Sequence, residues 1–157
     1  PTLMAVCPGN SGRSILAEAI LRRRGAGRII ALSAGTNPVG AVHPAAREAL
    51  EAAGISAAGL RSKGIAEIAA PAAPPLDLVI AFCPQAMAEL PARLPGRPAR
   101  VLWALPDPLS APPGQVTLAC RTCRDRLAAR IDRLLALPLD RLPRAALAAA
   151  IAESAAA

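Results

Sequence analysis

Short apolar segments that alternate with helical patterns constrain the fold of this chain most strongly. Residues 3–7, 28–33, 76–82 and 100–104 have the length and apolar character of buried strands. Strands that alternate with helices form a parallel sheet covered by helices on both faces. A chain of 157 residues has the length of one domain with a substantial core. We therefore predict a single three-layer α/β domain around a four-stranded parallel sheet.

Helical patterns occupy most of the intervals between these strands. The clearest covers residues 14–24, where apolar side chains recur at helical spacing and glycines follow. Further helices are expected over 44–53 and 116–136, with short helical turns at 65–69 and 87–90 and an Ala-rich helix after Pro143. This pattern divides the chain into a domain of residues 1–140 and a C-terminal Ala-rich helical extension of residues 141–157.

Composition and charge exclude several classes of protein. The hydrophobic fraction of 54% excludes a disordered chain. The apolar runs are too short to span a bilayer, and no leader with a basic and then an apolar region is visible, so no membrane partner is expected. The net charge of +7 comes from scattered arginines without aromatic stacking residues, which argues against nucleic acid and favours a small anionic substrate. Four cysteines without a secretory signal indicate free thiols in a cytoplasmic protein, which we expect to be a monomer.

The sequence CPGNSGRS, residues 7–14, places a thiol and a guanidinium at the two ends of one short loop. Backbone N–H groups of such a loop form an anion-binding nest, and the dipole of the following helix adds positive potential. Arg13 can hold two oxygens of a tetrahedral oxyanion, and Ser14 can donate a hydrogen bond to a Cys7 thiolate that the same field stabilises. The alternative is a structural cysteine beside a surface arginine. We predict a nucleophile at Cys7 and an oxyanion site formed by Pro8, Gly9, Asn10, Ser11, Gly12 and Arg13.

Two further residues follow the third and fourth strands, whose carboxyl ends lie at the same edge of a parallel sheet as Cys7. Asp107, held between two prolines, is a candidate general acid for the departing oxygen; the alternative is an ordinary turn aspartate. Cys83 ends the third strand. If that strand neighbours the first, Cys83 is a candidate resolving thiol for Cys7; the alternative is a small buried hydrophobic residue.

The other polar residues of interest have plain structural explanations. Cys120 and Cys123 fall on one face of the longest helix with Leu127, which favours core packing over a redox or zinc pair. His43, the only histidine, precedes a helix and has no metal-ligand companion, so we expect no bound metal. Lys63 is either an added positive charge for the site or a surface lysine.

Taken together, these motifs resemble the low-molecular-weight protein tyrosine phosphatase superfamily, and within it the thiol-dependent arsenate reductases. The resemblance covers nearly the whole chain, through VCPGNSGRSILAEAIL, ALSAGTNPVGAVHPAAREALEAAGI, LRSKG, LDLVIAFC and LWALPDPL. It implies a flavodoxin-like strand order 2-1-3-4. It also implies Cys7 as nucleophile, Arg13 as oxyanion clamp, Ser14 as stabiliser of the thiolate, Asp107 as general acid and Cys83 as first resolving thiol.

Two differences from the family pattern bear on the activities that the resemblance implies. Thioredoxin-coupled reductases carry a third cysteine about eight residues after the second, where this chain has Leu90 and Pro91. Tyrosine phosphatases carry aromatic residues beside the Asp-Pro pair, where this chain has Leu109. We therefore predict an arsenate reductase without a bound cofactor, reduced by thioredoxin, glutaredoxin or a low-molecular-weight thiol. The alternatives are a phosphatase that hydrolyses phosphomonoesters through a phosphocysteine, and a non-catalytic oxyanion-binding module.

Overall fold

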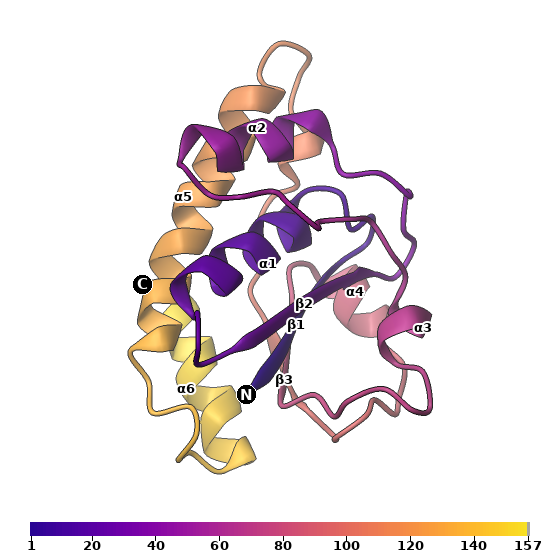
Figure 1. Ribbon diagram of the computed structural model, residues 1–157, viewed down its shortest axis with the longest axis vertical. Coiled ribbons are helices and arrows are strands. Elements are labelled where there is room, and N and C mark those ends of the chain that lie inside the picture. Colours follow the sequence, from indigo (N-terminus) through magenta and orange to yellow (C-terminus); the bar gives the residue numbers. More distant parts are fainter. Residues whose placement is uncertain (157) are drawn as a thin grey trace.

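The computed structural model describes residues 1–156 of the chain and is built on one four-stranded parallel sheet (Figure 1). The strands are β1 (Thr2–Cys7), β2 (Ile30–Gly35), β3 (Leu78–Ala81) and β4 (Ala99–Leu102). They lie in the order β2-β1-β3-β4, and every pair of neighbours is parallel. The predicted sheet and its 2-1-3-4 order are therefore confirmed.

Helices cover both faces of the sheet. The described helices are α1 (Arg13–Arg24), α2 (Pro44–Ala52), α3 (Ile65–Ile68), α4 (Pro84–Glu89), α5 (Val116–Leu135) and α6 (Arg144–Ala156), with a 3₁₀ turn at Pro108–Ser110. Alternate residues of β1 belong to different cores, as the pleat of a strand requires. Leu3, Ala5 and Cys7 contact a larger core that includes α1, α2, α5 and α6, whereas Met4 and Val6 contact a smaller one that includes α3 and α4. The predicted three-layer arrangement is confirmed.

Several element boundaries differ from those expected, each for a local reason. The second strand starts two residues late because a turn occupies residues 25–29, where Arg28 and Ile29 both donate N–H groups to the Gly25 carbonyl. The fourth covers 99–102 instead of 100–104, and β3 covers 78–81 instead of 76–82. The turn expected at 87–90 is a helix that begins earlier, since Pro84 stands at its first position.

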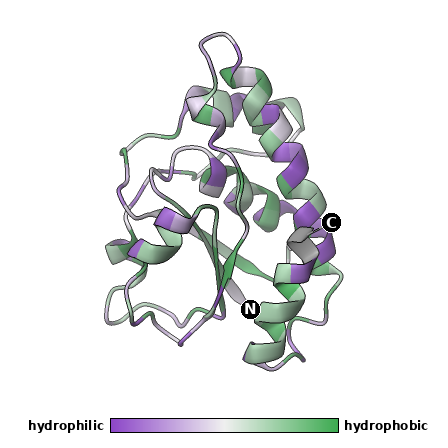
Figure 2. Cartoon of the chain, turned by 180° about the vertical axis from the view of Figure 1, so that it is seen from behind, coloured by the Kyte–Doolittle hydropathy of each residue, from purple (hydrophilic) through white to green (hydrophobic). Residues whose placement is uncertain are grey.

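The C-terminal helix closes one side of the larger core. Leu147 and Ile151 of α6 are buried, and Figure 2 shows α6 as largely apolar, whereas α5 beside it has many hydrophilic positions. Trp103, which is 1% exposed, donates its Nε1 hydrogen to the Ile151 carbonyl at 3.2 Å. The division into residues 1–140 and an extension stays a prediction, and the last residue of that extension, Ala157, lies outside the described residues. Within those residues, no helix is long and apolar enough to cross a bilayer.

Trp103→Phe tests how α6 is attached. The variant keeps an aromatic ring in the core but removes the hydrogen bond to Ile151, so we expect the free energy of unfolding to fall by about 1–2 kcal/mol. Equilibrium urea unfolding measures the loss, and hydrogen exchange should show faster exchange in α6 than in β1. Unchanged exchange in α6 would contradict the anchoring role of this bond.

Candidate active site

The loop between β1 and α1 has its carbonyl groups turned outward. The carbonyls of Cys7, Pro8, Gly9 and Ser11 accept N–H groups from residues 36, 37, 39 and 43 of the segment after β2, at 2.8–3.3 Å. Among the described residues, no acceptor is recorded for the backbone N–H groups of residues 9–12. Asn10 adopts φ 47°, a left-handed conformation that asparagine tolerates. The loop therefore has the backbone geometry of an anion nest at the N-terminus of α1.

Close approach of this loop to β2 requires a glycine at position 35. A Cβ atom there would lie 2.6 Å from the carbonyl oxygen of Pro8 and 3.1 Å from the backbone nitrogen of Asn10. Neither atom belongs to a flexible side chain that could move aside. The "SAGT" sequence at the end of the second strand thus supports the shape of a loop that lies far from it in the sequence.

The Cys7 thiol, which is 3% exposed, contacts a single hydroxyl. Its Sγ lies 2.9 Å from the Ser14 Oγ. The same Oγ accepts an N–H hydrogen from the Asn10 side chain at 2.8 Å. Because that bond uses a lone pair of Ser14, the hydroxyl hydrogen is available to the sulfur. The contact is compatible with a hydroxyl that donates to the sulfur, and the role of Ser14 toward a thiolate stays a prediction.

A buried polar network behind the loop holds Asn10 in place. Its amide donates to Ser33 Oγ at 3.0 Å, and its Oδ1 accepts the backbone N–H of Lys63 at 2.9 Å. Ser33 in turn donates to Glu18 at 2.5 Å. The Lys63 ammonium lies 3.5 Å from the same Glu18 oxygen and 3.4 Å from Ser33 Oγ. Asn10 therefore braces the loop from behind and, being fully buried, is not among the residues that line the cavity.

Lys63 and Glu18 form a buried ion pair within the network behind the loop. The Lys63 side chain is 9% exposed, so it is not a surface lysine, and the Glu18 side chain is 5% exposed. Glu18 also forms an ion pair with Arg22. The signal in the sequence is that Glu18 is the single acidic residue within the otherwise apolar stretch 15–21. Burial of a carboxylate requires charged partners, and the network supplies them.

Arg13 is buried at the base of the cavity in front of the loop. It is 8% exposed and donates from Nη1 to the Leu105 carbonyl at 3.0 Å, which links α1 to the chain after β4. The cavity has a volume of about 410 Å³. Its lining includes Cys7, Arg13 and Asp107, together with Pro8, Gly9, Ser11, Gly12, Asn37, Val39, His43 and Leu109. Five of the six predicted oxyanion-binding residues thus share one cavity with the predicted nucleophile and acid.

Asp107 and His43 each cap a helical element and also line this cavity. The Asp107 carboxylate accepts the Leu109 N–H at 3.0 Å and the Ser110 hydroxyl at 3.1 Å. His43 accepts the Ala45 N–H at 3.0 Å and caps α2. Each residue therefore has a structural role as a helix cap and also lies at the cavity around Cys7.

Cys83 lies on the other side of the sheet from Cys7. Val6 is paired with Ala81, which sets Cys7 level with Phe82 and Cys83 one residue further on. The Cys83 thiol accepts the Ala86 N–H at 3.4 Å at the start of α4 and contacts the smaller core. Cys83 is not part of the described cavity lining around Cys7, and its role as a resolving thiol stays a prediction.

Cys120 and Cys123 are core residues of α5, as predicted. Burial is the main cause that raises the pKa of Cys120 to about 11 and that of Cys123 to about 12. Asp107 contributes to the first shift, and the neighbouring Cys120 to the second. Both thiols are therefore neutral near pH 7 and are poor nucleophiles.

The Lys63→Met variant tests the buried network. It keeps most of the side-chain volume but removes the ammonium from Glu18, so we expect the free energy of unfolding to fall by about 1–3 kcal/mol. Urea unfolding measures this loss. Arg61→Met is the matched control, because its ion pair with Glu67 is exposed and should contribute little to stability. Equal losses in the two variants would show that the Lys63 ammonium does not support the network.

The raised pKa values of Cys120 and Cys123 predict how the free energy of unfolding changes at alkaline pH. Their pKa values are raised in the folded chain above the unfolded value near 9.0. Their contribution to stability is therefore fully present below pH 9.0 and is lost as the pH rises through about 11 and 12. Urea midpoints measured across this range should fall more steeply for the native chain than for Cys123→Ala. If the urea midpoints of the two proteins change with pH in the same way, the raised pKa of Cys123 is wrong.

Comparisons with known proteins agree with this geometry. The family model described as low molecular weight phosphotyrosine protein phosphatase matches residues 2–141. A glutaredoxin arsenate reductase from Synechocystis sp. (strain PCC 6803) is 33% identical over 134 residues, which cover 85% of this chain and 95% of that protein. A solved arsenate reductase in the phosphate binding state is 31% identical, with a TM-score of 0.65 over 86% of this chain and 96% of that one. The low molecular weight protein tyrosine phosphatase of T. tengcongensis, 23% identical, shares the fold with a TM-score of 0.71 over 86% of this chain and 97% of that one. Because the family model matches nearly the whole sequence, the chain belongs to the low molecular weight phosphotyrosine protein phosphatase family.

Proposed function

We propose that this chain is an arsenate reductase that binds arsenate in the loop of residues 8–13 in front of Cys7. The observation that carries this proposal is the wall of the Cys7 cavity, which has aliphatic Val39 and Leu109 and no Phe, Tyr or Trp. The chain has no tyrosine, and its aromatic residues Phe82 and Trp103 are buried in the core. Such a cavity fits a bare tetrahedral oxyanion better than an aryl phosphate. The similarity to a protein named glutaredoxin arsenate reductase supports the same choice.

In the first step, the Cys7 thiolate attacks arsenic. The loop N–H groups and the Arg13 guanidinium hold the remaining oxygens and stabilise the charge that develops on them. As the sulfur–arsenic bond forms, one arsenic–oxygen bond breaks, and Asp107 donates a proton so that the oxygen leaves as water. Ser14, within 2.9 Å of the sulfur, can donate a hydrogen bond to it.

In the second step, Cys83 resolves the adduct. Its thiolate attacks the Cys7 sulfur, the sulfur–arsenic bond breaks, and the electron pair stays on arsenic. Arsenic(V) is thereby reduced to arsenic(III) and leaves as arsenite, while two thiols are oxidised to one disulfide. Because Cys83 contacts the opposite core in the structure, this step requires the start of α4 to unwind and carry Cys83 past the end of β3.

Regeneration of the enzyme needs two electrons from outside the chain. Leu90, in the neighbourhood where a third cysteine would stand, is a buried member of the smaller core, and the neutral thiols of α5 are poor substitutes. We propose that glutaredoxin, thioredoxin or a low-molecular-weight thiol reduces the disulfide in the cytoplasm.

A second candidate function is hydrolysis of phosphomonoesters. Membership of the phosphatase family favours it, as does the presence of Asp107 in the same cavity as Cys7. Cys7 would form a phosphocysteine, which a water molecule assisted by Asp107 would hydrolyse. This route needs no second thiol.

The Cys83→Ser variant separates the two functions. We expect it to lose arsenate-dependent thiol oxidation, by about a hundredfold or more, while aryl phosphate hydrolysis stays within about twofold, because only the first reaction needs a resolving thiol. Cys7→Ser should lose both reactions. The measurements are arsenate-dependent consumption of a dithiol and release of aryl alcohol. Mass spectrometry after one turnover should show a Cys7–Cys83 disulfide.

Cys123→Ala is the matched control for removal of a thiol outside the cavity around Cys7. It should retain arsenate turnover. If Cys83→Ser reduces arsenate as fast as the wild type, the resolving role is wrong. A Cys120–Cys123 disulfide after turnover would instead show that the α5 thiols take part.

A further inference from the structure

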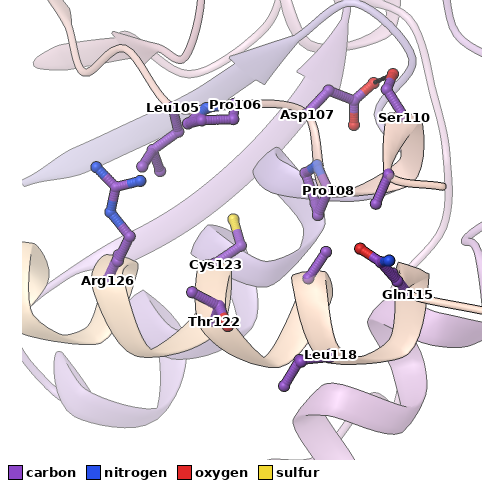
Figure 3. A pocket seen from close by; sticks show the side chains of 12 residues that line it. Leu105, Pro106, Asp107, Pro108, Ser110, Gln115, Leu118, Thr122, Cys123 and Arg126 are labelled. Carbon is purple, nitrogen blue, oxygen red and sulfur yellow. Dashed lines mark hydrogen bonds between the residues drawn. The ribbon is translucent and has the colours of Figure 1, made fainter.

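A second cavity lies behind the loop that carries Asp107, between residues 105–111 and the first half of α5 (Figure 3). We call it the α5 groove. Its volume is about 420 Å³, within the range of about 300–1,000 Å³ that is usual for binding sites. Leu105, Pro106 and Pro108 form one wall, and Leu118, Thr122 and Arg126 of α5 form the other. The function proposed above does not use this groove.

The groove adjoins the Cys7 cavity. Asp107 lines both cavities, and the loop of residues 105–109 separates them. On the Cys7 side, Arg13 donates a hydrogen bond to the carbonyl of Leu105, which is also part of the groove. A molecule seated in the groove therefore lies one loop away from the proposed catalytic thiol.

An apolar side chain is left exposed at the edge of the groove. Leu118 is 68% exposed, although one exposed leucine alone is unremarkable on a protein surface. Val39, which lines the Cys7 cavity, is 65% exposed. These are two of only four large hydrophobic residues described as exposed. Leu118 lines the groove and Val39 lines the Cys7 cavity, so each of the adjoining cavities offers an exposed apolar side chain to a partner.

Arg126, which lines the groove, and the neighbouring Arg130 carry positive charge at its other end. Arg126 and Arg130 follow at a spacing of one helical turn, and Arg130 donates to the Ala104 carbonyl just before the loop. Within residues 1–156, no ion pair is recorded for either arginine, whereas Arg121 pairs with Glu48. Burial, followed by the repulsion of Arg126 and Arg133, lowers the pKa of Arg130. This end of the groove thus offers a positive potential to an acidic partner.

We propose that the α5 groove is the docking surface for an acidic protein that supplies the reducing thiols. This inference rests on the proposed reductase function, which needs electrons from outside the chain. An apolar side chain of the partner would fill the groove beside Leu118, and its carboxylates would face Arg126. Such charge complementarity guides association and orientation. A nucleic acid fits less well, because the groove is largely apolar and has no aromatic side chain for stacking.

Steady-state kinetics with two reductants test the docking surface. Arsenate reduction is measured with varied concentrations of a purified glutaredoxin of net negative charge, and separately with dithiothreitol. We expect Arg126→Glu and Leu118→Ser each to raise KM for glutaredoxin by about tenfold, equivalent to about 1.4 kcal/mol. KM for arsenate and dithiothreitol-driven turnover should not change. Higher ionic strength should raise the wild-type KM for glutaredoxin more than that of Arg126→Glu.

Two matched variants control for charge and hydrophobicity. Arg93→Glu makes the same charge reversal in the exposed loop before β4, at the opposite end of the sheet, and Ile30→Ser removes another exposed apolar side chain. Both should leave KM for glutaredoxin within about twofold. If Arg93→Glu raises KM as much as Arg126→Glu does, net charge alone acts and the groove is not the docking surface. If the wild type oxidises neither reductant in response to arsenate, the reductase function itself fails, and this inference fails with it.

Discussion

The site depends on the hydrogen bonds that fix the carbonyl groups of the loop after β1. Four carbonyls accept N–H groups from the segment after β2, so the peptide units are held with their N–H ends toward the cavity. This orientation is preorganised and costs nothing further when an oxyanion binds. It depends in turn on the close contact between Gly35 and Pro8. The sheet places β1 beside β2, and that adjacency gives the loop its shape.

Much of this arrangement follows from local signals in the sequence. The βα alternation predicted the parallel sheet, and the spacing between Cys7 and Arg13 predicted a loop that opens a helix, because both are short-range patterns. Asp107 reached the same cavity because carboxyl ends of parallel strands share one edge. The Lys63–Glu18 pair was not predicted, since it joins residues 45 positions apart, and no local pattern indicates a contact over that separation.

The placement of Cys83 shows why register matters more than strand order. Neighbouring strands bring their ends within about 5 Å, which made contact between the two thiols plausible. Side chains alternate between faces, however, and Cys83 stands one residue beyond the position level with Cys7. It therefore belongs to the smaller core and Cys7 to the larger one. A one-residue offset that no sequence pattern reveals places the two thiols in different cores.

This separation has a consequence for the proposed chemistry. If both thiols faced one cavity in the resting enzyme, they could form a disulfide before arsenate bound. With Cys83 at the start of a six-residue helix, its release requires only a short element to unwind, and helices this short have little stability of their own. In the proposed reaction, this placement would keep Cys7 reduced until the oxyanion binds, and unwinding of α4 would set when Cys83 reacts.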